Sequence, residues 1–207
     1  EQLRDRFRRQ HESAVKIPHG RHRTTGVDAA VELEELLPRL PQWRLLKVLS
    51  YRQGIDKFLC AKSFVLLEDM LRENFGLAKC PEFSYESHGK PYLRDRPEIF
   101  FNISHCRRGI ACAVMDKPVG IDIEEIQFDE DLAKVIFNSE ELEAVRSADE
   151  PAVKFTELWT RKESFLKLTG EGLRDDMKDV LSCANEVSFT TEINQSAGYV
   201  YSTAIWK

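Results

Sequence analysis

Two carboxylates separated by a single residue are the first side chains here whose spacing suggests chemistry. Asp122 and Glu124 lie in the segment Gly120-Ile121-Asp122-Ile123-Glu124. In a β-strand they share one face, about 6 to 7 Å apart, while both isoleucines face the core. Such carboxylates repel each other unless a cation lies between them, and magnesium binds one or two carboxylates together with waters and phosphates. A strand with a solvated acidic face is the simpler alternative.

A second candidate pair is Glu163 and Lys167, four residues apart in the segment WTRKESFLK at 159–167. A helix places residues at this spacing on one face, and Trp159 lies a turn earlier on the same stripe. As an exposed ion pair the two would contribute only about 0.3–0.5 kcal/mol. The segment by itself fits a surface ion pair as well as a catalytic one.

Two further segments offer groups that bind phosphate. Ser104 and His105 end a predicted strand and lead into a predicted turn at 105–109, where hydroxyl, imidazole and backbone N–H groups can bind phosphate oxygens. Lys90 stands between a glycine and a proline, in a turn that should present its ammonium outward as a point charge. A structural histidine and a solvated lysine are the alternatives.

The apolar spacing predicts the elements that position these residues. Helices are expected over 29–49 in two pieces broken at Pro38 and Pro41, over 55–71 with an end near 74–76, from a cap at Ser139, and over 151–170. Strands are expected near 83–86, 99–103, 110–115, 119–124, 186–193 and 199–206. Helices then strands, twice over, indicate an α+β chain with halves at 1–118 and 119–207, the first 35 residues being unassigned.

Composition excludes several classes of protein. The chain has 207 residues, 42% apolar and 31% charged, which is ordinary globular usage. A net charge of -5 argues against a protein built to neutralise a nucleic-acid backbone. The five cysteines contain no C-x-x-C pair, so neither a disulfide framework nor a zinc site is expected. Because no apolar run approaches the roughly 20 residues of a membrane span, we expect a cytoplasmic protein without membrane contact.

In this order, the segments resemble the surfactin-type (Sfp-like) family of the 4'-phosphopantetheinyl transferase superfamily. The family pattern runs G-K-P, F-N-x-S-H, G-[IV]-D-[IV]-E, W-[ST]-x-K-E-[SA]-[FY]-x-K and G-x-G-L, and this chain has it at 89–91, 101–105, 120–124, 159–167 and 170–173. The resemblance covers about residues 40–205. It implies two pseudo-symmetric α/β halves with the active site at their interface.

The resemblance also implies an activity, the transfer of the 4'-phosphopantetheine group of coenzyme A to a serine of an acyl or peptidyl carrier protein. Magnesium, or manganese in its place, would be held by Asp122, Glu124 and Glu163. Glu163 would be the general base for the serine hydroxyl. The implied catalytic set is Glu163, Asp122, Lys167 and His105.

For coenzyme A, the resemblance implies that Lys167 and His105 bind phosphates and that Ser104 and Lys90 contribute at the nucleotide end. Arg44, Lys47 and Lys57 are similar to the family's basic positions for the 3'-phosphate, although the spacing there is about one residue shorter. Two rival functions are a magnesium-dependent phosphohydrolase and a non-catalytic coenzyme A binding module. A chain of two halves is expected to be a monomer.

Overall fold

The computed structural model describes residues 14–16, 26–172 and 176–207. Leu173, the last residue of the motif at 170–173, and most of the unassigned first 25 residues lie outside these ranges. Within the described ranges, no helix is both long and apolar enough to span a bilayer.

The first half consists of helices followed by strands. Its helical segments are α2 (Gly26–Leu36), the 3-10 turn η1 (Leu37–Arg39), α3 (Gln42–Ser50) and α4 (Gly54–Phe75). Its strands are β1 (Ala14–Lys16), β2 (Phe83–Tyr85), β3 (Pro91–Leu93), β4 (Phe100–Cys106) and β5 (Gly109–Met115). The predicted break at the two prolines is confirmed, since Pro38 lies in η1 and Pro41 caps α3.

The second half begins with a strand and ends with two. Its strands are β6 (Val119–Glu125), β7 (Val187–Asn194) and β8 (Tyr199–Trp206). Its helices are α5 (Glu130–Ile136), α6 (Ser139–Arg146), α7 (Pro151–Thr169) and the 3-10 turn η2 (Val180–Cys183). As predicted, α7 starts at Pro151 and stops at Gly170, whose φ of 76° is a left-handed conformation that glycine adopts without strain.

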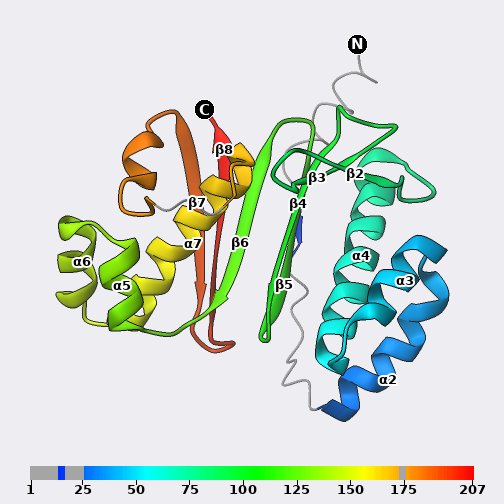
Figure 1. Cartoon of the computed structure of the whole chain (residues 1–207), viewed down its shortest axis with the longest axis horizontal. Coiled ribbons are helices and arrows are strands. Elements are labelled where there is room, and N and C mark those ends of the chain that lie inside the picture. Colours follow the sequence, from blue (N-terminus) through cyan, green and yellow to red (C-terminus); the bar gives the residue numbers. More distant parts are fainter. Residues whose placement is uncertain (1–13, 17–25, 173–175) are drawn as a thin grey trace.

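Two antiparallel sheets stand side by side in the centre of the molecule (Figure 1). Their strand orders are β1-β5-β4 and β6-β8-β7, and β2 pairs with β3 in a separate ribbon. Helices α2 to α4 cover the outer side of the first sheet, and α5 to α7 cover that of the second (Figure 1). This mixture of helices and antiparallel sheets confirms the α+β class.

The two sheets meet along an apolar layer, which we call the seam. It contains the buried residues Ala111, Ala113, Met115, Val119, Ile121, Ile123 and Tyr199. Strand β5 contributes one face to it, while the alternate residues Ile110, Cys112 and Val114 pack into the cores beneath α4. Alanines on the seam face leave room for the second sheet to come close, so β4 and β5 both lie beside β6.

Two local predictions are wrong. His105 does not open a turn, because β4 continues to Cys106 and His105 pairs with Ile110 in a hairpin whose turn is only two residues long. The cap of α6 is Asn138 rather than Ser139, because Asn138 stands three residues before Glu141 and the two complete a capping box. Strand β3 and helix α5 were not predicted.

Candidate active site

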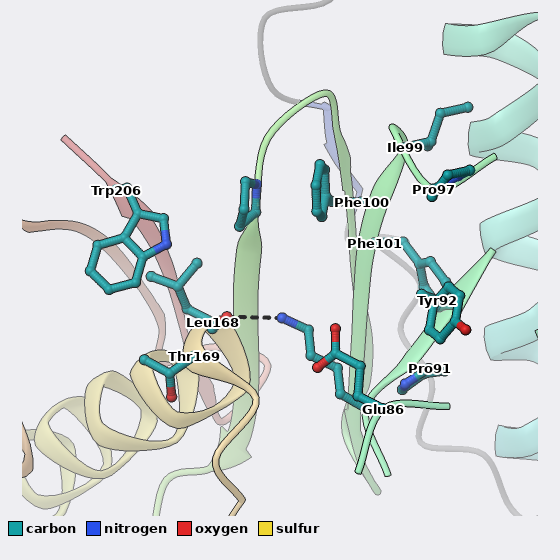
Figure 2. Close-up of a pocket in the computed structure, with 12 residues that line it drawn as sticks. Glu86, Pro91, Tyr92, Pro97, Ile99, Phe100, Phe101, Leu168, Thr169 and Trp206 are labelled. Carbon is teal, nitrogen blue, oxygen red and sulfur yellow. Dashed lines mark hydrogen bonds between the residues drawn. The ribbon is translucent and has the colours of Figure 1, made fainter. Parts of the chain in front are cut away.

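Strand β4 sends alternate side chains to opposite sides of the sheet. Phe101 and Ile103 pack into the first-half core under α4, whereas Asn102 and Ser104 are buried toward β6. Figure 2 shows the same alternation at the start of the strand, where Phe100 and Phe101 lie on opposite sides of it. The pattern F-N-x-S therefore describes a strand with one face in the core and the other on the second half.

The side chains of strand β6 also alternate between two faces, as the sequence predicted. Ile121 and Ile123 lie in the seam, and the alternate residues Gly120, Asp122 and Glu124 face helix α7. A side chain at Gly120 would overlap the backbone of Ser164 and Leu168, so glycine lets β6 lie directly against α7. Trp159 on that helix also lies beside Glu124.

Helix α7 brings Glu163 and Lys167 to the same place. The Lys167 ammonium donates to Asp122 Oδ1 at 2.5 Å and to Ser104 Oγ at 2.9 Å. Ser104 in turn donates to Asp122 Oδ1 at 2.8 Å. Three of the sequence motifs, on β4, β6 and α7, thus meet in one hydrogen-bonded cluster at the boundary of the two halves.

The carboxylates in this cluster affect one another. The pKa of Glu124 is raised to about 7, chiefly by burial, with the charges of Asp122 and Glu163 adding to the rise and that of Lys167 opposing it. Burial also raises the pKa of Glu163, and the charge of Asp122 adds to this effect. For both glutamates burial is the main cause of the raised pKa, and the charge of Asp122 adds to it.

A divalent cation suits this set of groups. Carboxylates are the hard oxygen ligands that magnesium prefers, and two of these oxygens, Asp122 Oδ2 and Glu163 Oε1, are buried without a hydrogen-bond partner. The carboxylates do not converge on a common point, since no three His, Cys, Asp or Glu side chains in the described part of the chain are grouped closely enough to hold a metal. The ligand set Asp122, Glu124 and Glu163 stays a prediction.

His105 lies at the end of β4, next to this cluster. Its side chain is exposed, yet neighbouring protein displaces enough water to lower its pKa, and the positive charges of Lys167 and Arg44 lower it further. Asp56, in the first turn of α4, acts in the opposite direction. Charged groups of the carboxylate cluster and of the first-half helices therefore both influence His105.

The basic residues predicted for the 3'-phosphate lie on those helices. Arg44 is buried in α3, where its Nη2 donates to Cys60 O at 3.0 Å and its guanidinium lies 5.4 Å from the centre of the Phe64 ring. Lys47 is exposed on the same helix, and Lys57 follows in the first turn of α4. Because Arg44 is turned inward, its role as a phosphate ligand stays a prediction.

Lys90 differs from its predicted orientation. Its ammonium does not project outward but crosses to the second half, where it donates to Leu168 O at 2.9 Å, the dashed line in Figure 2. Burial lowers the pKa of this lysine. The carbonyls in the last turn of a helix lack partners within the helix and carry partial negative charge, so a cation there is favourable.

Two cavities meet at Lys90. The smaller, about 290 Å³, joins the turn at His88 and Gly89 to Asn102, Glu163 and Lys167. The larger, about 540 Å³, opens between the halves, with Leu168, Thr169 and Trp206 on one wall and Pro91 and Tyr92 on the other (Figure 2). The smaller cavity is the one that connects the turn before Lys90 to Glu163 and Lys167.

Two residues of this region were not singled out from the sequence, although both lie inside its motifs. Asn102 accepts a hydrogen bond from the backbone N–H of Ile121 at 2.8 Å. Lys162 is completely buried, and its ammonium donates to Met177 O at 2.7 Å and pairs with Glu141 at 2.8 Å. The spacing of Asn102 two residues before Ser104 on one strand face could have identified the first.

Replacing Lys162 by Met should destabilise the protein by about 2 kcal/mol, because it leaves the Met177 carbonyl and the Glu141 carboxylate without their partner. For a chain of this length the melting temperature should fall by roughly 4–8 °C. Differential scanning calorimetry measures the change. Lys154→Met removes a surface ion pair from the same helix and should have almost no effect, so equal melting temperatures for both variants would contradict the prediction.

Comparison with known proteins places these motifs in a family. Residues 118–204 match the sequence profile of the 4'-phosphopantetheinyl transferase superfamily. The 4'-phosphopantetheinyl transferase psf-1 of Bacillus pumilus is 34% identical over 150 residues, which cover 70% of this chain and 64% of that protein. The 4'-phosphopantetheinyl transferase Sfp of Bacillus subtilis is 37% identical over 113 residues, or 53% of this chain and 50% of that protein.

A eukaryotic relative is more distant. The L-aminoadipate-semialdehyde dehydrogenase-phosphopantetheinyl transferase of Saccharomyces cerevisiae is 29% identical over 161 residues, which cover 70% of this chain and 57% of that protein. The chain thus spans between half and two thirds of the length of these three relatives. The matched region contains β6 and α7, the elements that hold all three carboxylates. Through this half the chain is similar to the 4'-phosphopantetheinyl transferase superfamily, in agreement with the resemblance that its motifs indicated.

Proposed function

We propose that the chain transfers the 4'-phosphopantetheine group of coenzyme A to a serine of an acyl or peptidyl carrier protein and releases adenosine 3',5'-bisphosphate. The observation that carries this proposal is the cluster of Asp122, Glu124, Glu163 and Lys167 at the boundary of the two halves. The names of the relatives support the reaction type. The name of the yeast relative gives one example of a protein that such an enzyme modifies.

In the proposed reaction the serine oxygen attacks the phosphorus that carries the pantetheine arm. A new P–O bond forms to serine, and the pyrophosphate P–O bond to the bridging oxygen breaks, so that oxygen leaves with adenosine 3',5'-bisphosphate. Glu163 takes the hydroxyl proton, directly or through a water, and its unpartnered Oε1 is available as the acceptor. Lys167 and His105 bind phosphate oxygens and balance the charge that develops on the leaving group.

Asp122, Glu124 and Glu163 are the residues that would hold magnesium, or manganese in its place. When bound, the ion would neutralise charge on the pyrophosphate. Ser104 supports this arrangement, because its hydroxyl donates to Asp122 Oδ1 and leaves the other oxygen of that carboxylate available. Lys167 would then be free to turn from Asp122 toward a phosphate, a change of partner that a long flexible side chain allows.

The nucleotide end of coenzyme A would follow the smaller cavity, away from the carboxylates and toward the turn at 88–90. Gly89, Lys90 and Pro91 line this route. Ser104 would contribute at the nucleotide end, and Arg44, Lys47 and Lys57 would supply positive charge for the 3'-phosphate. In this proposal residues 1–118 and 119–207 are pseudo-symmetric halves with the site between them. A monomeric state and a cytoplasmic location stay predictions.

The test is to incubate the protein with coenzyme A, magnesium and a carrier protein in its apo form. Mass spectrometry should show the carrier heavier by one phosphopantetheine group, with an equal amount of adenosine 3',5'-bisphosphate released. Release of the nucleotide without any carrier would favour the phosphohydrolase. Tight binding of coenzyme A without transfer to carriers from fatty-acid, polyketide and peptide-synthetase systems would favour the non-catalytic module.

Replacing Lys167 by Ala should weaken coenzyme A binding by roughly 10- to 100-fold, the loss expected for a charge-assisted hydrogen bond to phosphate. Isothermal titration calorimetry measures the dissociation constant without any carrier protein. Lys154→Ala, which removes a lysine of the same helix that pairs with Glu157, should leave the affinity unchanged. Unchanged affinity in Lys167→Ala would remove the proposed phosphate role.

A further inference from the structure

The carboxylate strand β6 lies at the edge of its sheet. Within the described residues the sheet orders are β1-β5-β4 and β6-β8-β7, so β4 and β6 face each other as edges that share no ladder. An edge strand has backbone N–H groups without a strand partner, and burying one of them unpaired costs about 1–3 kcal/mol. Ile121 is fully buried on this edge. Its N–H therefore needs an acceptor from elsewhere.

Asn102 provides that acceptor. Its side-chain oxygen accepts the Ile121 N–H at 2.8 Å, and Asn102 is itself 6% exposed. The side-chain amide of Asn102 thus supplies the hydrogen-bond acceptor that a carbonyl of a neighbouring strand would otherwise supply to β6. Together with the hydrogen bonds of Ser104 to Asp122 and Lys167, it adds direction to a boundary whose seam is apolar, and apolar contacts allow sliding more readily than a hydrogen bond does.

The position of this bond makes it relevant to the site. Asn102 and Ser104 are two residues apart on one face of β4, and their partners Ile121 and Asp122 are consecutive on β6. The bond with Asn102 fixes the backbone of β6, and the bond with Ser104 fixes the carboxylate of Asp122. A shift of β6 along β4 would break both, and it would carry Asp122 away from Ser104.

From this arrangement we infer that Asn102 is a positioning residue, which sets the register of β6 against β4 and thereby the place of the Asp122 carboxylate. Its catalytic consequence depends on the proposed transfer reaction, but the register itself does not. The bond to Ile121 and the effect on turnover can therefore be measured separately. Asn102 also borders the smaller cavity, so a direct contact with coenzyme A is the alternative to be distinguished.

The register is tested by amide hydrogen exchange in Asn102→Leu, which has a side chain of similar size without an acceptor. The Ile121 amide should exchange about tenfold faster or more than in the unchanged protein. The amide of Phe64 in the core of α4 reports any loss of global stability, and the Ile121 change must exceed it. An unchanged Ile121 amide would overturn the inference whether or not the protein is a transferase.

A second variant separates the acceptor from the bulk of the side chain. Asn102→Asp keeps an oxygen where the Ile121 N–H points, so the amide should remain protected within about threefold after correction with the Phe64 reference. Equal exchange rates of the Ile121 amide in the Leu and Asp variants would show that side-chain volume, and not the acceptor, protects this amide. That result would contradict the proposed role of the Asn102 hydrogen bond. This comparison also applies if Asn102→Leu is only marginally folded.

Kinetics then distinguish positioning from substrate contact. For Asn102→Leu, kcat should fall by about tenfold or more while the KM for coenzyme A stays within about threefold, because the carboxylates move and the phosphate ligands do not. Asn74→Leu, which removes a hydrogen bond to Met70 O far from the seam, should change neither constant. A raised KM with unchanged kcat would identify Asn102 as a coenzyme A contact and overturn the positioning role.

Discussion

Glu163→Gln should lower the rate of transfer to the carrier protein by about 100-fold or more while leaving the melting temperature nearly unchanged. Glutamine keeps the size of the side chain but can neither accept the serine proton nor contribute charge to a cation. The fold should tolerate the change, because burial already disfavours the charge of Glu163 and its Oε1 has no hydrogen-bond partner to lose. Single-turnover transfer, followed by mass spectrometry of the carrier, measures the rate.

Glu157→Gln is the matched control for this experiment. Glu157 lies on the same helix but forms ion pairs with Lys154 and Arg161 away from the carboxylate cluster, so its loss should reduce the rate by less than about twofold. If Glu163→Gln retained more than about a tenth of the activity of the unchanged protein, the base or the third metal ligand would have to lie elsewhere.

Gly120→Ala should damage both the stability and the activity. A Cβ at this position overlaps Ser164 O and Leu168 N and comes within 3.0 Å of Leu168 Cα, and these backbone atoms belong to a packed helix that cannot move locally. We expect a loss of about 3 kcal/mol or more, equivalent to a fall of roughly 6–12 °C in melting temperature. Residual folded protein should transfer poorly, because β6 and α7 carry the carboxylates on the two sides of the overlap.

Gly54→Ala is the corresponding control. Gly54 is the first residue of α4, and a side chain there would meet no atom within 4 Å. Its melting temperature and activity should match those of the unchanged protein within experimental error. Thermal unfolding of both variants is the measurement, and a Gly120→Ala variant as stable as Gly54→Ala would mean that the strand and helix can separate without cost.

The local sequence pattern was sufficient to predict those features that depend on one helix or one strand. The two long helices α4 and α7 were predicted because their apolar spacing and their terminal glycines act within one segment. The alternation in β6 separated Ile121 from Asp122 because side chains on a strand have a fixed period of two. The motif residues Asp122, Glu163 and Lys167 were also expected near one another, and in the structure Lys167 pairs with Asp122, while the charges of both residues affect the pKa of Glu163.

What the sequence did not indicate depends on contacts between distant segments. Lys90 was expected in solvent, because nothing near it in sequence shows that the end of α7 lies within its reach. His105 was assigned to a turn because polar residues at a strand end resemble a loop, but its pairing with Ile110 extends the strand. The correct cap at Asn138 was readable in principle, since a glutamate follows three residues later.

The seam has a consequence for how the chain folds. One apolar layer serves two sheets, so Ala111 and Ala113 from one half and Ile121 and Ile123 from the other are shielded from water by each other rather than by their own helices. Neither half, taken alone, would have a fully covered core, because each would expose aliphatic side chains on the face of its sheet that now contacts the other half. The smallest cooperative folding unit is therefore the two halves together. Cleavage of the short connection at 116–118 would leave two fragments that tend to associate with each other or to aggregate.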